Sequence, residues 1–222
     1  MPSADVESIS IEFPKLEPLF WKFVAFGERA VAAFALALVS PVLFLAMLSV
    51  TFLSRRSPLV AHRRVGEAGC AIWVLKLRTM WSKECDGRWL FVERLPSSQT
   101  DCQAPKAAGD PRVTHRFAAL CRRFSVDELP QLWNVLQGEM ALVGPRPLTS
   151  SELRRHYGPD AVEILTRRPG ISGLWQITGR SRLSYAQRRR LDLFLVRNWS
   201  IALYCKILLV TLPKALTGKN AW

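Results

Sequence analysis

Residues 30–54 form an uncharged apolar run, AVAAFALALVSPVLFLAMLSVTFLS. A helix of this length is long enough to reach across the hydrocarbon core of a bilayer. The residues before the run are acidic and no small-residue cleavage site follows it, which is not the pattern of a secretory signal peptide. The sequence therefore predicts that this chain folds against a membrane.

The midpoint of the apolar run is Ser40-Pro41. Proline removes a backbone donor and clashes with the preceding turn, so a kink is expected. A kinked single span is one interpretation, because a nearby serine can bond the carbonyl that proline frees. Basic residues flank the run on both sides, which gives little orientation signal. We favour a re-entrant helix over residues 29–55 that enters the membrane, breaks at Ser40 and Pro41 and returns to the same face.

The charge is unevenly distributed along the 222 residues. Three basic and five acidic residues lie in residues 1–54, which leaves 28 basic and 13 acidic residues for residues 55–222. A basic field of this kind favours an anionic partner, which is nucleic acid, anionic membrane lipid or a phosphorylated small molecule. The five cysteines are odd in number and contain no C-x-x-C pair. They predict a reducing compartment, with neither a disulfide framework nor a zinc site.

The remaining chain predicts a mostly helical α+β fold: an N-terminal segment over residues 1–28, the re-entrant helix over residues 29–55 and one small membrane-associated globular domain over residues 56–222. Residues 70–80, CAIWVLKLRTM, have the composition of a strand that ends near Lys76 and Arg78. Irregular structure is expected over residues 81–111 and, because of their glycines, over most of residues 167–184. Expected helices cover residues 113–124 and 129–136, a stretch from residue 185, and an apolar C-terminal stretch that lies in the membrane interface.

Two adjacent carboxylates, Asp127 and Glu128, stand in the stretch FSVDELPQLWNVLQGEMALVGPRP. Ser125 with Glu128 three residues later matches a helix capping box, which would make the pair structural. Pro130 argues against that interpretation, because proline prefers the first position of a helix and not the fifth. If the helix begins near Pro130, both carboxylates lie just outside its amide-rich end. The chemistry alone leaves the capping and the functional interpretation open.

Around this pair the sequence offers many donors suited to phosphate, since guanidinium groups match phosphate oxygens bidentately. These residues are Lys76, Arg78, Arg112, Arg122, Arg123, Arg146, Arg168 and Arg180. Carboxylates beside such donors indicate a diphosphate substrate with Mg²⁺, held by Asp127 and Glu128. For residues 188–190 we expect only solvation or contact with lipid headgroups. The three histidines are isolated and are expected to be structural.

Five motifs, in the order KLRTM, DPRVT, SVDELPQLWNVLQGEMALVGPRP, RPGISGLWQITGR and LDLFLVRNWS, resemble the bacterial sugar transferase family. These are monotopic polyprenyl-phosphate phosphoglycosyl transferases of bacterial inner membranes, and the resemblance covers almost all of residues 29–216. Within the family the chain is similar to the short members of exopolysaccharide production, whose sugar is typically galactose or glucose.

The resemblance implies transfer of a sugar-1-phosphate from a UDP-sugar to undecaprenyl phosphate at the cytosolic face. The family's Asp-Glu pair falls on Asp127 and Glu128. It implies that Asp127 attacks the phosphorus that bears the sugar and forms a covalent intermediate, while Glu128 helps to hold Mg²⁺. Arg122 and Arg146 match arginines of the family's phosphate site, and the Ser-Pro pair matches the break of its re-entrant helix.

Three positions depart from the family pattern, at Ala118, Ala141 and Tyr204, where glycine, serine and aspartate are usual. Two other classes also remain open. A membrane-tethered nucleic-acid binder would explain the basic excess, although no nucleic-acid motif is present and we expect no nucleic-acid partner. A non-enzymatic membrane scaffold would explain the apolar helices but has no need of the carboxylate pair. The sequence identifies neither the sugar nor the oligomeric state.

Overall fold

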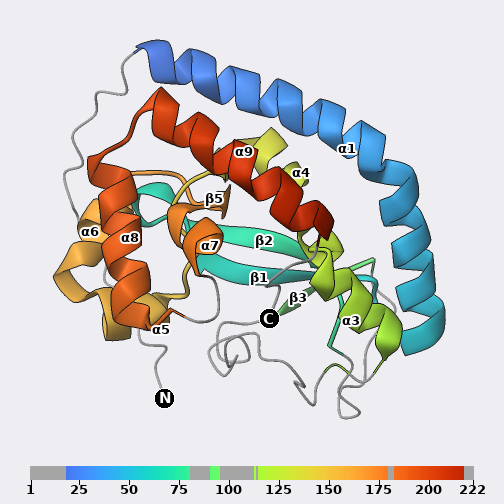
Figure 1. Ribbon diagram of the computed structural model, residues 1–222. Helices are drawn as coiled ribbons and strands as arrows, with labels where there is room; N and C mark the ends of the chain where they lie inside the picture. Colours follow the sequence, from blue (N-terminus) through green and yellow to red (C-terminus); the bar gives the residue numbers. More distant parts are fainter. Residues whose placement is uncertain (1–18, 81–90, 96–112, 114, 180–182, 218–222) are drawn as a thin grey trace.

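The computed structural model describes residues 19–80, 91–95, 113, 115–179 and 183–217, and it is mostly helical with short strands (Figure 1). Residues 1–18 of the predicted N-terminal segment lie outside the described residues, and residues 19–28 form the start of the long helix α1 (Leu19–Ser54). A central three-stranded sheet is covered by α1 and by α4 (Gln131–Gln137). A second, two-stranded sheet joins this part to a group of helices on the other side of the molecule.

Helix α1 is continuous for 36 residues and contains Pro41 in its interior. Pro41 lacks the N–H that would otherwise bond to the carbonyl of Ala37, and the Ser40 hydroxyl donates to that carbonyl at 2.8 Å instead. The serine thus satisfies the acceptor that the proline leaves. Figure 1 shows α1 arching over the globular part and changing direction along its length. The Ser-Pro pair is accommodated inside the helix and does not end it.

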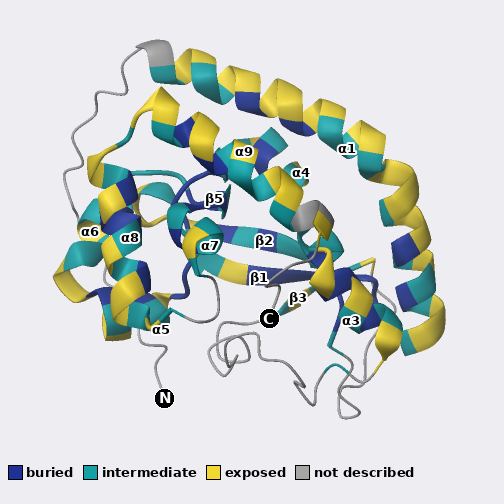
Figure 2. Cartoon of the chain, viewed as in Figure 1, coloured by how far each residue is buried: buried dark blue, intermediate teal, exposed yellow. Residues whose placement is uncertain are grey.

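Both halves of α1 contact the same globular unit. Ala32 packs in a core cluster with Val74 of the sheet, and Ala46 and Val50 pack in another with Leu77. The outward side carries exposed apolar residues along the whole helix (Figure 2): Phe23, Phe26, Val31, Phe34, Leu38, Val42, Phe44, Leu45, Phe52 and Leu53. The helix from Trp21 to Ser54 is long and apolar enough to cross a membrane.

Strand β1 (Leu59–Val65) pairs antiparallel with β2 (Ala71–Leu77) and parallel with β3 (Val92–Leu95). The strand predicted over residues 70–80 is thereby confirmed, and its alternation places Ile72 and Val74 in the core under α1 and α4. The prediction of irregular structure over residues 81–111 is wrong for β3. The sequence of β3, VERL, is too short and too charged to be recognised as a strand. Its extended structure comes from pairing with β1.

Residues 167–184 were expected to be largely loop, and this is wrong for eight of them. They form β5 (Gly170–Ser172), which pairs parallel with β4 (Ala141–Val143), and α7 (Leu174–Thr178). The glycines allow the pairing, because a Cβ at Gly170 would lie 2.1 Å from the backbone nitrogen of Gly144. Here glycine marks a close backbone approach and not a loop.

The predicted helices are confirmed with slightly different ends: α3 (Arg116–Arg123), α4, α8 (Tyr185–Arg197) and α9 (Ile201–Thr217). Between β4 and β5 lie short helical turns: α5 (Ser150–Glu152), η3 (Leu153–Tyr157), η4 (Gly158–Asp160) and α6 (Ala161–Ile164). Helix α9 packs on β4 through Tyr204 and Ile207, while Leu209 and Leu212 are exposed. On α8, Leu195 is buried, whereas Phe194 is half exposed.

Candidate functional site

The carboxylate pair lies in the short turn η2 (Val126–Glu128), between α3 and α4. Ser125 before it has a left-handed backbone, with φ 56° and ψ 23°, and makes no side-chain capping bond within the described part of the chain. Helix α4 begins after Pro130, as the sequence argument expected. The capping-box interpretation is therefore wrong, because the chain reverses at Ser125 and the pair lies ahead of the helix.

The two carboxylates have different surroundings. Asp127 is only 3% exposed, whereas the Glu128 side chain is 23% exposed and its Oε1 lies 3.5 Å from Lys76 Nζ. Burial, and then the charge of Asp127, raises the pKa of the Cys121 thiol to about 11, so this neighbour stays protonated. The pair therefore combines a buried aspartate with a glutamate that reaches solvent beside a lysine.

Predicted basic residues of β2 and α3 lie beside this turn. Lys76, near the end of β2, contacts Glu128, and Arg122 is buried in the last turn of α3. Arg78 instead holds the sheet together, since its Nε donates to the Ser57 carbonyl at 2.8 Å and its guanidinium pairs with Glu93 of β3. Arg78 was predicted to bind phosphate, but in the structure its side chain already contacts Ser57 and Glu93.

Sequence reasoning missed Asn134, a buried residue of α4. Its side-chain oxygen accepts from the Leu75 amide at 3.0 Å, and its nitrogen donates to the Trp73 carbonyl at 2.8 Å. The same nitrogen donates to Glu139 at 2.7 Å. These bonds fix α4 to β2, the strand that carries Lys76. The only signal for this role in the sequence was an asparagine within an expected short apolar helix.

Arg146 belongs to a second group of charged residues. Its guanidinium lies 5.3 Å from the ring centroid of Trp175, and that of Arg188 lies 4.9 Å from the same centroid. We call these three residues the arginine–tryptophan cluster. Arg188 is only 8% exposed, so the expectation that it is merely solvated or in contact with lipid is wrong. Helical periodicity turns Arg188 inward, whereas Arg190 is exposed.

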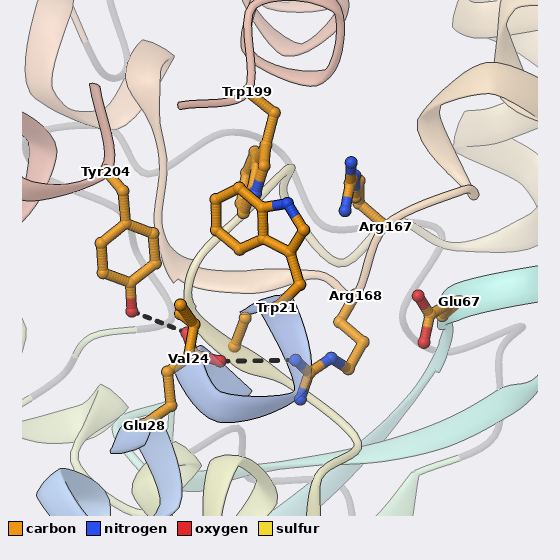
Figure 3. A pocket seen from close by; sticks show the side chains of 9 residues that line it. Trp21, Val24, Glu28, Glu67, Arg167, Arg168, Trp199 and Tyr204 are labelled. Carbon is orange, nitrogen blue, oxygen red and sulfur yellow. Dashed lines mark hydrogen bonds and ion pairs between the residues drawn. The ribbon is translucent and has the colours of Figure 1, made fainter. Parts of the chain in front are cut away.

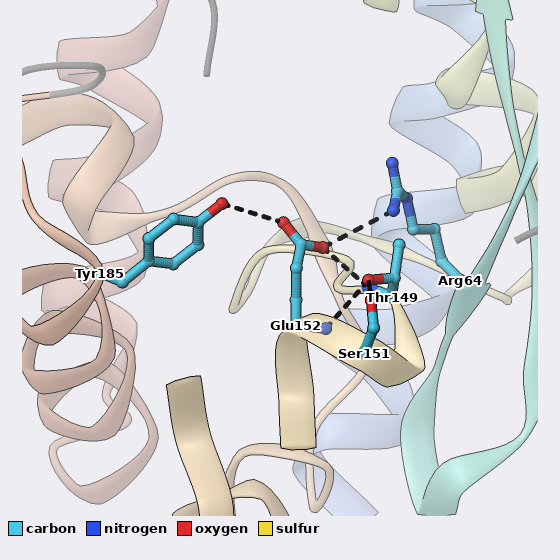
Figure 4. Close-up of polar contacts among 5 residues, drawn as sticks. All are labelled: Arg64, Thr149, Ser151, Glu152 and Tyr185. Atoms are coloured by element: carbon cyan, nitrogen blue, oxygen red, sulfur yellow. Dashed lines mark hydrogen bonds and ion pairs between the residues drawn. The ribbon is translucent and has the colours of Figure 1, made fainter. Parts of the chain in front are cut away.

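Two carboxyls lie near this cluster, one partly exposed and one buried. Figure 4 shows Glu152 between Arg64, Tyr185 and Thr149. Its Oε2 lies 3.6 Å from Arg64 Nη1 and accepts from the Thr149 amide at 2.9 Å, while its Oε1 accepts from Tyr185 at 3.4 Å. Asp192 is fully buried and accepts from the Tyr157 hydroxyl at 2.8 Å. Burial raises the pKa of Asp192 to about 7, against the opposing effects of Tyr157 and Arg146.

Arg168 lies at a third place, a pocket near the starts of α1 and α9 (Figure 3). It pairs at 3.4 Å with Glu28, a buried residue of α1 that also accepts from the Leu142 amide at 2.9 Å. The hydroxyl of Tyr204 donates to Glu28 at 2.7 Å, so this departure from the family pattern helps to anchor α1. Arg123 is exposed in the last turn of α3, and the predicted phosphate-binding residues Arg112 and Arg180 lie outside the described residues.

Of the isolated histidines, His62 is buried in β1 and His115 caps α3, where its Nδ1 accepts from the Phe117 amide at 3.1 Å. Burial, followed by the charges of Lys76, Arg64 and Arg78, lowers the pKa of His62 to about 3. A neutral imidazole is therefore expected there at neutral pH.

No three His, Cys, Asp or Glu residues within the described ranges come together as a metal cage. Asp127 and Glu128 are two adjacent carboxylates. This donor set fits Mg²⁺, which binds proteins through one or two carboxylates and completes its shell with phosphate and water.

A comparison with protein families identifies the family of this chain. The model of the bacterial sugar transferases matches residues 22–218. The chain belongs to the bacterial sugar transferase family. Among curated relatives, the exopolysaccharide production protein ExoY of Rhizobium meliloti is 40% identical over 192 residues, which covers 86% of this chain and 84% of that protein.

Two further relatives carry names that state a donor or acceptor. The UDP-galactose-lipid carrier transferase of Erwinia amylovora is 40% identical over 168 residues, which is 75% of this chain and 35% of that protein. The UDP-glucose:undecaprenyl-phosphate glucose-1-phosphate transferase of Caulobacter vibrioides is 37% identical over 199 residues, or 86% of this chain and 68% of that protein. This sugar transferase thus resembles relatives that use two different sugars.

Proposed function

We propose that this sugar transferase moves a sugar-1-phosphate from a UDP-sugar to undecaprenyl phosphate, as the first membrane step of exopolysaccharide or glycoconjugate synthesis. Galactose or glucose is the favoured sugar, because relatives named for each cover most of this chain. The observation that carries the proposal is the position of Asp127, buried in a turn ahead of α4 with Glu128 and Lys76 beside it.

In the proposed reaction an oxygen of Asp127 forms a bond to the phosphorus that carries the sugar, and UMP leaves with the electrons of the broken phosphorus–oxygen bond. An oxygen of the lipid phosphate then attacks the same phosphorus and restores the Asp127 carboxylate. A positioned carboxylate divides one displacement into two steps. The buried position of Asp127 keeps water away from its side chain, which protects a reactive acyl phosphate.

The remaining residues of the site bind and orient. Lys76 holds Glu128 through their ion pair and brings a positive charge near the phosphates. Arg122, buried in the adjacent helix end, is placed to bind a phosphate oxygen. Asp127 and Glu128 would hold Mg²⁺, which when bound neutralises phosphate charge and orients the diphosphate.

We place the globular unit at the cytosolic face of the bacterial inner membrane, with α1 dipping in and returning. Support comes from the contacts of α1, since Ala32 in its first half and Val50 in its second both pack on the globular unit. A straight span would carry one of these contacts across the bilayer. The exposed apolar side of α1 and residues Leu209 and Leu212 of α9 would face lipid, including anionic lipid near the basic residues.

Thiol labelling tests this topology. Single cysteines near residues 10 and 220, in a background without other cysteines, should both resist a membrane-impermeant reagent in intact cells. Labelling of the first position alone would establish a span. Pro41→Ala is expected to favour a spanning form, and an unchanged pattern would assign the bend to other residues.

Incubation with labelled UDP-sugars tests the reaction. Purified chain with Mg²⁺ and UDP-galactose, UDP-glucose or an N-acetylated analogue should release UMP without any lipid, and should retain one labelled phosphosugar that peptide mapping places at Asp127. Asp160→Asn is a matched control, because Asp160 is partly exposed and pairs with Arg189 at 3.5 Å. A label on Glu128 would reverse the roles of the two carboxylates. Release of no UMP from any sugar would favour a scaffold.

A further inference from the structure

The arginine–tryptophan cluster holds two guanidinium groups on one indole ring. Arg146 comes from the turn after β4, Trp175 from α7 and Arg188 from α8. Arg188 lies 5.1 Å from the ring centroid of Tyr185 as well, so aromatic rings surround its charge. Two positive charges brought this close repel each other, and rings compensate only part of that repulsion.

Nearby carboxyls neutralise this charge incompletely. Glu152 is engaged by Arg64, Tyr185 and the Thr149 amide (Figure 4). Asp192 accepts from Tyr157, and burial holds its pKa near 7, so it carries less than a full negative charge at neutral pH. The charge of Arg146, after burial, lowers the pKa of Arg188, which agrees with an excess of positive charge at this place.

Two buried donors of the cluster lack an acceptor among the residues that the structure describes. These are Nε of Arg188, a residue that is 8% exposed, and Nε1 of Trp175, a residue that is 5% exposed. A buried donor without an acceptor costs free energy, so its retention calls for a reason. An anionic oxygen ligand would lessen both the repulsion and the shortage of acceptors.

We propose that Arg188 is a phosphate-binding residue, which acts with Arg146 beside Trp175 to bind a phosphate group of one of the two substrates. Guanidinium forks in a desolvated place match phosphate oxygens in shape and charge. The ligand is the diphosphate of the nucleotide sugar or the phosphate of the polyprenyl acceptor. This inference rests on the proposed transferase function and adds a binding residue that the linear motif around Asp127 does not contain.

Binding measurements on the full chain in nanodiscs test the proposal with two probes, UDP and a short-chain polyprenyl phosphate, each by calorimetry. Arg188→Gln should weaken the binding of at least one probe by roughly 10- to 100-fold, the range for a lost charge-assisted hydrogen bond. The probe that is affected identifies the source of the phosphate. Arg190→Gln is the matched control, because it removes the same charge from an exposed position of the same helix.

Several outcomes would overturn the proposal. Wild-type affinity of Arg188→Gln for both probes would do so, as would an equal loss in Arg190→Gln, which would indicate a general field of the basic surface. If Arg188→Gln melts far below the wild type, Arg188→Lys keeps the charge without the planar fork, and wild-type affinity of that variant for both probes would contradict a bidentate phosphate site. If the wild type releases UMP and the Arg188 variants bind both probes as tightly as it does, only the proposed role of Arg188 is overturned. If the wild type releases no UMP and binds neither probe, the proposed function is overturned as well.

Discussion

Among the residues that the structure describes, two aspartates are buried in arginine-rich surroundings, and their environments differ. Asp127 lies in a turn between two short helices, beside Glu128 and Lys76, whose side chains are 23% and 22% exposed. Asp192 lies in the middle of the 13-residue helix α8, where its partner Tyr157 is 1% exposed. One aspartate therefore has a polar route to solvent next to it, and the other is enclosed.

This difference teaches that burial beside arginine does not by itself mark a nucleophile. A nucleophile needs room for a substrate atom beside its carboxylate, and a turn ahead of a helix provides that more readily than a helix interior. Asp192 instead orders the helices around it through Tyr157 and through the backbone of Arg146. We therefore propose the first region for the reaction, and the second for the support of the arginine–tryptophan cluster.

The largest effect is expected when the same conservative change is made at both aspartates. Asp127→Asn should lower turnover by roughly 10⁴-fold or more and abolish the labelled phosphosugar adduct, since an amide cannot replace the attacking carboxylate. Asp192→Asn should still form the adduct. Both are measured by UMP release and adduct mapping with the same labelled UDP-sugar.

A well-folded Asp192→Asn protein that forms no adduct would place the second aspartate in the reaction and end the distinction between the regions. Full activity of Asp127→Asn would remove the covalent mechanism altogether. Thermal melting of both variants controls for loss of fold.

Glu128→Gln should have the next largest effect, because it weakens Mg²⁺ binding and also removes the ion pair with Lys76. Turnover should fall by roughly 10²-fold to 10³-fold, while a slow adduct at Asp127 still forms. Titration of the rate with Mg²⁺ should give a higher half-saturating concentration than in the wild type. An unchanged Mg²⁺ dependence would show that Glu128 does not hold the metal.

The first region could be predicted from the sequence because its residues are neighbours in the chain. Asp127, Glu128 and Pro130 stand within four positions, and proline's preference for a helix start was enough to place the pair ahead of α4. Lys76 was predicted at the end of a strand, although nothing in the sequence stated that it would meet Glu128. Tertiary pairing of that kind depends on strand register and on Asn134, and neither leaves a local signal.

The second region could not be predicted, since its residues come from distant parts of the chain. The residues of this region come together only after the two-stranded sheet and α8 have formed; they are Arg64, Arg146, Glu152, Trp175 and Arg188. The glycines that allow this sheet were taken as loop signals, because a close backbone approach and a loop have the same local composition. Arg188 was misjudged because three consecutive arginines do not indicate which one faces inward.

A smaller effect is expected at Asn134, which ties the first region to the sheet. Asn134→Ala should lower the free energy of unfolding by about 2 to 3 kcal/mol, because it leaves the Leu75 amide and the Trp73 carbonyl without their buried partner. Turnover should fall with little change in the KM for UDP-sugar, since the carboxylate pair moves relative to Lys76. Denaturant unfolding in micelles and steady-state kinetics measure the two effects, and Asn198→Ala, at the exposed end of α8, is the control.

The smallest effect is a change in pH dependence that separates the two aspartates by stability. Burial raises the folded-state pKa of Asp192 to about 7, while an unfolded aspartate has a pKa of about 3.9. The folded chain therefore keeps a proton that the unfolded chain has lost, so the free energy of unfolding falls as pH rises toward and through 7. Between pH 6 and 7 this contribution is about 1 kcal/mol by linkage. Asp192→Asn cannot ionise, so its free energy of unfolding should not show this fall. Denaturant unfolding at pH 6 and pH 7 should therefore show that the wild type loses stability relative to the variant as the pH rises. The same gap at both pH values would mean that Asp192 is ionised in the folded chain and neutralises Arg146 and Arg188 fully, which would weaken the case for an excess of positive charge in the arginine–tryptophan cluster.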